Sequence, residues 1–428
     1  MADRLDIIIF GATGYTGKVG IEEIIPLAKE KGGLTWGIAG RNQKKLQDAL
    51  DDVAKKTGVS LKDIPIIIAN IDDEESMRNM TKQCKVLVNC VGPYRHWGEQ
   101  AVKACIDSGT NHVDVSGEPQ YMEKMQLLYN KKAQEKGIYI VSACGFDSIP
   151  AEIGSQFFSK QFEGEPNAVE TYLTSSNKNR SKSAGIHYGT WESAVYGLGH
   201  ANELRPLRQQ LFPHRLPTMS PRLQSRGVVF RNPVGRGWCL PFLGSDLSVM
   251  RRSQYHFHEK KGLRPLQIQC YFTLPNLIAV MGVMFIASIF FVLAKFSLGR
   301  KLLLAYPKLF SCGFVSHEGP TEESRKSTKF SITFVGEGWT EKNNVDGNQH
   351  SSPPDTRVVT KVTGFDPGYG FTTRCLLLCA ITIMKEADKM PATGGVYPPG
   401  AAFAETSLMS ELQSHGLAME VVEKKNIK

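Results

Sequence analysis

The chain has 428 residues, of which 41% are apolar and 22% are charged, and its formal net charge is +9. This length exceeds what one hydrophobic core serves comfortably, so we expect two domains, and the lack of a fixed-period repeat argues against solenoids and propellers. The basic residues are spread along the chain without the aromatic spacing of an RNA-binding sheet, so nucleic acid is not an expected partner.

Cysteine use and the first residues indicate the compartment. The nine cysteines form no CxxC pair and show no zinc-ligand spacing, so we predict no metal site. Most of them lie in apolar stretches, which indicates buried, reduced thiols. The opening "MADRLD" is polar and leads directly into a strand, so we expect no secretory signal peptide.

Short apolar runs alternate with helical patterns through the first 150 residues. The predicted strands are 5–10, 34–40, 64–70, 85–92, 111–117 and 138–146, with helices at about 18–31, 42–58, 73–84, 98–110 and 118–137. This alternation predicts an α/β fold, a Rossmann-type doubly wound parallel sheet with helices on both faces. Ligands of such sheets bind beyond the carboxyl ends of the strands, and the unusual residues of this region gather there.

The stretch "GATGYTG" follows the first predicted strand. Gly11 allows a tight turn, Gly14 lets a pyrophosphate approach the backbone, and Gly17 lets the helix pack closely on the sheet. Free N–H groups at the start of that helix then meet the phosphates. The turn therefore predicts a dinucleotide site that contains Gly11, Thr13, Gly14, Tyr15, Thr16 and Gly17.

The second predicted strand ends in Gly40 and Arg41, where an NAD-binding protein would carry an acid. An acid there would repel a 2′-phosphate, whereas an arginine can pair with it. We therefore predict NADP(H) in preference to NAD(H). The alternative is a surface arginine whose side chain turns outward.

The ends of the later strands complete the candidate site. Asp72, Cys90, Val91, Gly92 and Pro93 are the remaining predicted cofactor contacts. Tyr94 and Asp147 are the predicted catalytic residues, since each offers a group for proton transfer beside a nicotinamide. For Tyr94 the alternative is packing on the cofactor, and for Asp147 it is capping the helix that follows. His96 and His187 also lie near predicted strand ends, but a lone histidine is more often structural.

Beyond residue 150 the pattern changes to alternating strands at 167–176, 329–340 and 355–370, which predicts a second, α+β domain. The stretch 189–199 reads as a passage from strand to helix, and the Pro- and Arg-rich residues 203–236 as loops. A buried helix is expected at 372–387. A helix, a glycine stop and a short strand are expected at 407–424.

The run "LIAVMGVMFIASIFFVLA" (277–294) holds eighteen consecutive residues without a charge. A buried core helix, a spanning helix and a monotopic anchor are the three readings of such a run. Cations flank it on both sides, and "FSLGRKLLLAYPKLF" after it mixes apolar and basic residues as an interfacial element does. We therefore favour a hairpin-like insertion of 274–310 into a lipid surface.

The motifs "FGATGYTG", "AGR", "VNCVGPY", "DVSGEPQ" and "CGFDSIP", in this order, resemble those of the saccharopine dehydrogenase-like oxidoreductases. They are also similar to those of bacterial trans-acting enoyl reductases. The resemblance covers nearly the whole chain. It implies a Rossmann domain (1–150), an α+β substrate or dimerisation domain (151–385) and a segment (386–428) that returns to the Rossmann side.

The resemblance also implies association with the cytosolic face of membranes or with lipid droplets. Saccharopine reductases carry a "GLDPG" loop near the substrate, and this chain has "GFDSI" at 145–149, without the proline and second glycine. The leading hypothesis is an NADP(H)-dependent oxidoreductase that acts at a lipid surface on a small molecule, with lipids among the candidate substrates. A homodimer is compatible with this hypothesis. A catalytically silent nucleotide-binding scaffold and a saccharopine reductase are the alternatives.

Overall fold

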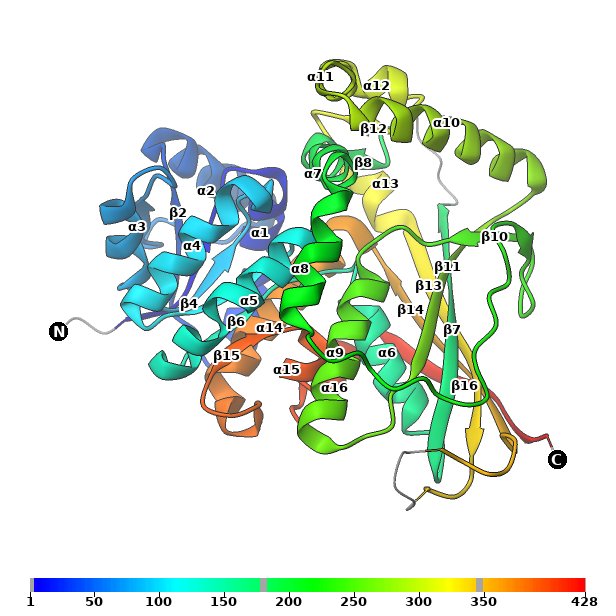
Figure 1. The fold of residues 1–428 in the computed structure, drawn as a ribbon. Coiled ribbons are helices and arrows are strands. Elements are labelled where there is room, and N and C mark those ends of the chain that lie inside the picture. Colours follow the sequence, from blue (N-terminus) through cyan, green and yellow to red (C-terminus); the bar gives the residue numbers. More distant parts are fainter. Residues whose placement is uncertain (1–3, 178–182, 344–348, 428) are drawn as a thin grey trace.

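The computed structural model describes residues 4–177, 183–343 and 349–427. Two large sheets lie side by side, each packed against helices, and the earliest part of the chain, in blue and cyan, belongs to the first sheet (Figure 1). This is the expected Rossmann-type parallel sheet with a second, mixed-sheet part, so the predicted fold class is confirmed. The domain boundaries at residues 150 and 385 stay predictions.

The first sheet is parallel throughout and has the strand order β15-β6-β5-β4-β1-β2-β3. Its strands are β1 (Leu5–Phe10), β2 (Trp36–Gly40), β3 (Ile66–Ile68), β4 (Cys84–Asn89), β5 (Asn111–Asp114), β6 (Tyr139–Val141) and β15 (Gly395–Tyr397). Ile7, Ile8 and Ile9 are fully buried, as expected of a strand that is covered on both faces. The strand order reverses at β1, so a ligand crevice is expected between β1 and β4.

Helices cover this sheet. They are α1 (Tyr15–Glu30), α2 (Gln43–Thr57), α3 (Glu74–Thr81), α4 (Tyr94–Ser108), α5 (Pro119–Lys136) and, from the later chain, α14 (Thr372–Glu386). The predicted burial of α14 is confirmed, because almost every residue from Thr372 to Ile383 is buried. Helix α4 begins four residues before the predicted start at 98, because the Glu118 carboxylate accepts hydrogen bonds from the Tyr94 and Arg95 amides.

The second sheet has the order β16-β14-β13-β7-β11-β10-β9, and only the β7–β11 pair is parallel. Its strands are β7 (Glu165–Asn177), β9 (Phe230–Arg231), β10 (Trp238–Pro241), β11 (Gln267–Leu274), β13 (Thr328–Trp339), β14 (Thr356–Phe365) and β16 (Ala418–Asn426). Helices α6 (Ile149–Ser159) and α9 (Asp246–Lys261) pack on this sheet. The C-terminal segment contributes to both sheets, since β15 pairs with β6 and β16 pairs with β14.

Shorter elements connect these parts. They are α13 (Glu322–Ser327), α15 (Pro399–Ala402), α16 (Leu408–Ser414), the single turns η1 (Ala201–Glu203), η2 (Pro367–Phe371) and η3 (Ala387–Lys389), and a two-stranded parallel ribbon of β8 (Ile186–His187) and β12 (Val315–Ser316). The expected loop at 203–236 is partly wrong, because α8 (Leu204–Leu211) forms there. Arg208 on α8 makes a bidentate ion pair with the buried Glu123, and Pro206 falls in the first turn, where it is tolerated.

An outer helical layer lies on one side of the molecule, at the top of Figure 1. It consists of α7 (Tyr188–Gly199), α10 (Leu277–Lys295), α11 (Ser297–Ala305) and α12 (Pro307–Phe310). The stretch 189–199 is therefore helical throughout, without the expected strand. Helix α10 is one continuous helix that packs on α7 and on the following helix α11. The insertion of 274–310 into a lipid surface stays a prediction.

Among the residues that the structure describes, two segments are long and apolar enough to cross a membrane, namely α10 and Pro367–Lys389. The second is mostly buried and is a core helix, with 78% of its most apolar window inside the protein. Only 11% of the corresponding window of α10 is buried, so α10, unlike the second segment, is not a core helix.

Candidate functional site

The glycine turn after β1 has the geometry that its sequence predicts. Gly11 has φ +82°, and a Cβ there would lie 2.7 Å from the Val91 side chain. A Cβ on Gly17 would lie 2.3 Å from the Gly11 carbonyl oxygen. Both positions therefore require glycine. Thr13 and Gly14 are exposed and Gly14 precedes the first turn of α1, so the amino end of this helix is open to a phosphate.

Beside this turn lies a polar hollow of about 400 Å³, lined by Thr13, Arg41, Asn42, Lys45 and Asn70. Arg41 is exposed at the end of β2, and Lys45 lies in the first turn of α2. The side chain of Asn42 accepts a hydrogen bond from the Lys45 amide at 2.9 Å, which caps α2 and fixes this corner. The hollow therefore brings two cations to the end of β2, where a 2′-phosphate would lie in this fold.

Sequence reasoning singled out Thr13 and Arg41 but missed Lys45, Asn42 and Asn70. The base-rich start of α2, "NQKK", was the available signal. Asp72 was predicted as a cofactor contact, but Asn70, not Asp72, lines the hollow. Asp72 is exposed in the following turn, and its amide donates to the Asn70 side-chain oxygen.

The loop Cys90–Pro93 lies against the glycine turn, and its predicted contact with the cofactor stays a prediction. Val91 is the side chain that a Cβ on Gly11 would strike, and the Val91 amide donates to the Asn89 side chain at 3.0 Å. Burial raises the pKa of the Cys90 thiol to about 12, so this cysteine stays protonated. Gly92 is exposed and offers backbone to a ligand.

Tyr15 is in the glycine turn, but its ring points toward the later part of the chain. The hydroxyl donates to the Pro320 carbonyl oxygen at 2.5 Å. The ring stacks on His187 with centroids 5.2 Å apart and meets Tyr369 edge-on at 4.5 Å. Tyr15 therefore joins the turn to the second sheet's side of the molecule, a role that the glycine motif alone does not indicate.

Tyr94 is buried at the start of α4. Its hydroxyl donates to the Asn89 carbonyl oxygen at 3.0 Å, and its ring lies beside that of Tyr121. Burial raises its pKa well above the ordinary value. Tyr94 therefore packs inside the protein on Tyr121. Its catalytic role, and the alternative of packing on the cofactor, stay predictions.

Asp147 follows β6 at the same edge of the sheet. One carboxylate oxygen accepts the Ser245 amide at 3.2 Å, and the other is buried without a hydrogen-bond partner among the described residues. Burial raises the pKa of Asp147 and of its neighbour Asp246, which the Asp147 charge raises further. The residue that precedes α6 is Ser148, so Asp147 is not the helix cap.

Helix α7 crosses this edge of the sheet. Ser193 donates to the Glu118 carboxylate after β5 at 2.8 Å. Arg95, after β4, donates to the Tyr196 carbonyl oxygen at 3.2 Å. At the amino end of α7, His187 caps the helix and stacks on Tyr15 after β1. One helix thus contacts the ends of three neighbouring strands.

The opposite face of α7 contacts the apolar layer, by which we mean α10, α11 and α12 of the outer helical layer. Trp191 meets Phe290 of α10 edge-on at 4.7 Å, and its indole N–H donates to the Leu303 carbonyl oxygen at 2.9 Å. A single helix therefore separates the cofactor edge from α10 and α11.

Within the described parts of the chain, one group of side chains has metal-ligand chemistry, namely Glu30, Glu411 and His415. The Lys31 ammonium lies 2.9 Å from Glu30 and 2.5 Å from Glu411. The lysine is ion-paired with both carboxylates, so the group is an ion-pair network between α1 and α16.

Residues 7–141 match the saccharopine dehydrogenase NADP binding domain. The chain is 39% identical over 421 residues to the mouse protein named saccharopine dehydrogenase-like oxidoreductase, which covers 97% of each chain. It is 34% identical to a Caenorhabditis elegans protein named lipid droplet localized protein, over 98% of each. A weaker similarity, 27% over 97% of each, links it to a putative trans-acting enoyl reductase of Mycobacterium tuberculosis.

Among solved structures, apo saccharopine dehydrogenase (L-Glu forming) from Saccharomyces cerevisiae has the same fold, with a TM-score of 0.51 at 11% identity over 98% of this chain and 100% of the yeast chain. The domain match supports the predicted cofactor, NADP(H) in preference to NAD(H). On the full-length similarity to the mouse protein, this chain belongs to the saccharopine dehydrogenase-like oxidoreductases.

Proposed function

We propose that this protein is an NADP(H)-dependent oxidoreductase that acts on an apolar carbonyl or enoyl substrate at the surface of a lipid droplet or membrane. The observation that carries the proposal is the position of α7, which contacts the cofactor edge through Ser193 and the apolar layer through Trp191. A substrate drawn from a lipid surface would need to pass only this helix to reach the nicotinamide.

The polar hollow supports the cofactor part of the proposal. Arg41 and Lys45 would hold the 2′-phosphate of NADP(H), while Gly11, Gly14 and the open amino end of α1 would hold the pyrophosphate. The nicotinamide would then lie toward the Cys90–Pro93 loop and the end of β5. When bound, the cofactor supplies the hydride.

The apolar layer supports the part of the proposal that concerns a lipid surface. Its exposed side chains include Ile278 (82% exposed), Phe285 (69%), Phe296 (63%), Leu298 (68%) and Leu309 (70%). A soluble protein rarely leaves so many large apolar side chains together in water, and such surfaces mark interaction sites. Lys295 and Lys301 are exposed in the same layer and would face anionic headgroups. The nematode relative's name, which places that protein on lipid droplets, is consistent with this.

Asp147 is the group that we propose as the proton donor. It lies after β6, and one of its carboxylate oxygens lies 3.5 Å from where a Cβ on Gly117, after β5, would be placed. Because burial raises its pKa, the carboxyl holds a proton at higher pH than an exposed aspartate and can donate it to a substrate that accepts a hydride.

The test is NADPH oxidation by the full-length protein with lipid aldehydes, lipid ketones and enoyl esters carried in phospholipid vesicles. Turnover of at least one of these substrates is expected, with loss of turnover and unchanged NADPH affinity in Asp147→Asn. Ser410→Ala, a change at an exposed position on α16, is the control and should leave turnover and NADPH affinity unchanged.

Two other results would replace the proposal. Tight NADPH binding without turnover of any substrate identifies a nucleotide-binding scaffold. Turnover of saccharopine in solution, with none of the lipids accepted, identifies a saccharopine reductase and removes the lipid substrate.

A further inference from the structure

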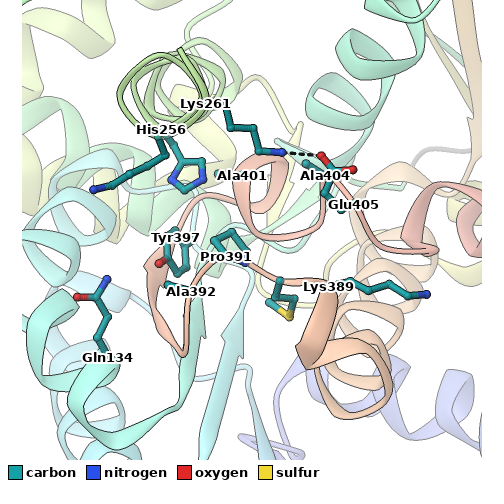
Figure 2. Close-up of a pocket in the computed structure, with 12 residues that line it drawn as sticks. Gln134, His256, Lys261, Lys389, Pro391, Ala392, Tyr397, Ala401, Ala404 and Glu405 are labelled. Atoms are coloured by element: carbon teal, nitrogen blue, oxygen red, sulfur yellow. Dashed lines mark hydrogen bonds and ion pairs between the residues drawn. The ribbon is translucent and has the colours of Figure 1, made fainter. Parts of the chain in front are cut away.

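A second hollow of about 400 Å³ lies beside β15, between that strand and the C-terminal end of α9 (Figure 2). We call it the β15 pocket. Strands β6, β5 and β4 separate β15 from β1 in the sheet, and residues 389–392 of the pocket wall precede β15 in the chain. The glycine turn follows β1, so the β15 pocket is distinct from the candidate cofactor site.

Apolar groups form most of the wall of this pocket. Pro391 and Tyr397 lie together below α9, and Ala401 and Ala404 lie opposite them (Figure 2). The Tyr397 hydroxyl already donates to the Gly394 carbonyl oxygen at 3.1 Å, so its ring is the part available to a ligand. Met390 adds a buried, adaptable side chain. This wall suits a hydrocarbon, and its size is in the range of small-molecule sites.

Lysines surround the pocket, and their charges are only partly balanced. Lys261 is paired with Glu405 at 2.5 Å, and Lys389 is paired with Glu386 at 2.9 Å. Lys260 also lines the pocket and has no ion pair within the described residues. One positive charge therefore remains without a counter-ion at the edge of an apolar wall.

His256 lies on the same turn of α9 and offers a neutral donor. Burial and the nearby Lys261 and Lys260 lower its pKa to about 4, so its imidazole is uncharged near neutral pH. The ring meets the Tyr397 ring edge-on at 5.4 Å, and within the part of the chain that the structure describes neither ring nitrogen makes a hydrogen bond. A neutral imidazole has one N–H to donate.

We propose that the β15 pocket binds a small aliphatic carboxylate, with the hydrocarbon on the Pro391–Tyr397 wall and the carboxylate between Lys260 and His256. A carboxylate matches this donor set, because it carries a single charge and each of its two oxygens accepts one of the two donors. An inorganic phosphate would carry more charge than Lys260 balances and would leave the apolar wall in contact with water. An uncharged alcohol of equal length would cover the apolar wall and leave Lys260 unpaired.

The test is calorimetric titration of the full-length protein with decanoate below its micelle-forming concentration, beside decanol and inorganic phosphate. Decanoate is expected to bind, with decanol about tenfold weaker and phosphate without measurable binding. Lys260→Gln should weaken decanoate binding about tenfold, the loss expected for one charged hydrogen bond. Ala404→Phe, which places a ring in the half-buried wall, should abolish it.

Lys29→Gln, a change of an exposed lysine on α1, is the matched control and should leave the affinity unchanged. Equal affinities of the wild type and Lys260→Gln, or of decanoate and decanol, overturn the proposed carboxylate contact. Full binding by a folded Ala404→Phe protein places the ligand elsewhere and overturns the site. If Ala404→Phe does not fold, the Lys260 variant and the decanol comparison still decide between these results.

Discussion

The hydroxyl of Tyr15, in the glycine turn, donates a hydrogen bond to the carbonyl oxygen of Pro320 at 2.5 Å, although 305 residues separate the two in the chain. Pro320 follows β12, and β12 follows the apolar helices α10 to α12. Gly319 lies against the same ring, since a Cβ there would come within 2.8 Å of it. The turn predicted to hold the cofactor is thus directly connected to the segment that leaves the apolar layer.

Tyr15 was predicted to bind the cofactor, and its contacts predict a structural effect instead. Tyr15→Phe should lower the free energy of unfolding by about 1 kcal/mol, the value of one hydrogen bond. Tyr15→Ala should lower it by about 3 kcal/mol in total, because the contacts with His187 and Tyr369 are also lost. Urea unfolding measures both, and NADPH affinity should change little in Tyr15→Phe. A large loss of NADPH affinity with unchanged stability would show that the ring serves the cofactor.

The second prediction concerns the polar hollow. Arg41→Ala and Lys45→Ala should each weaken NADPH binding about tenfold or more and leave NADH binding nearly unchanged, because only NADPH carries the 2′-phosphate. Fluorescence titration with each cofactor measures this. Lys44→Ala is the matched control, since Lys44 is an exposed neighbour on α2 that does not line the hollow. A wild type that binds NADH more tightly than NADPH would refute the assignment of the hollow.

The residues in these two tests also show which parts of the site could be predicted from the sequence. Strand β1, Gly11 and Arg41 were predictable because the signals are local: a buried apolar run, a turn that requires glycine, and the residue that ends the next strand. Lys45 and Asn70 were missed because their place in the hollow depends on how α2 and β3 pack beside β1. The direction of the Tyr15 ring depends on Pro320, which no local pattern connects to the turn.

The same distinction between local signals and tertiary contacts applies outside the site. Helix α10 was predictable from its uncharged run, but its packing on α7 depends on partners such as Trp191. Helix α8 was missed because Pro206 and the Pro- and Arg-rich stretch around it indicated a loop, although Leu, Arg and Gln favour a helix. The Arg208–Glu123 ion pair joins α8 to α5. Tertiary contacts decided both cases.

The third prediction is a pH dependence. Glu152 is 2% exposed, its carboxylate accepts the Ser253 hydroxyl at 2.6 Å, and burial raises its pKa to about 7. The folded state therefore binds the proton more tightly than the unfolded state, in which the carboxyl has its ordinary pKa of 4.5. Ionised Glu152 thus costs stability, with no cost below about pH 4, a growing cost up to pH 7 and a constant cost above it.

Glu152→Gln removes this titration. Its free energy of unfolding relative to the wild type should rise by about 3 kcal/mol between pH 4 and pH 8, because the wild-type carboxyl has a pKa of about 7 when folded and of 4.5 when unfolded. Denaturant unfolding at a series of pH values measures the difference. Glu135→Gln, at an exposed position on α5, is the control and should show a difference that does not vary with pH. A pH-independent difference for Glu152→Gln would mean that the carboxyl does not titrate in this range.

The last prediction tests the lipid surface. Phe285 on α10 is 69% exposed, so Phe285→Glu should leave the fold intact and place a charge where the hydrocarbon of a droplet or bilayer would lie. The burial of one phenylalanine side chain is worth about 1.5–3 kcal/mol, so the fraction bound to vesicles should fall about tenfold or more. Flotation with vesicles that contain anionic lipid measures this.

Leu128 on α5 is the matched control, because it is 47% exposed on a helix outside the apolar layer. Leu128→Glu should float like the wild type, and in cells it should stay on lipid droplets while Phe285→Glu becomes diffuse. If both variants float equally well, the exposed face of α10 is not the lipid contact. A wild type that does not bind vesicles or droplets at all would remove the lipid surface from the proposed function and leave the NADPH-dependent chemistry to be tested with soluble substrates.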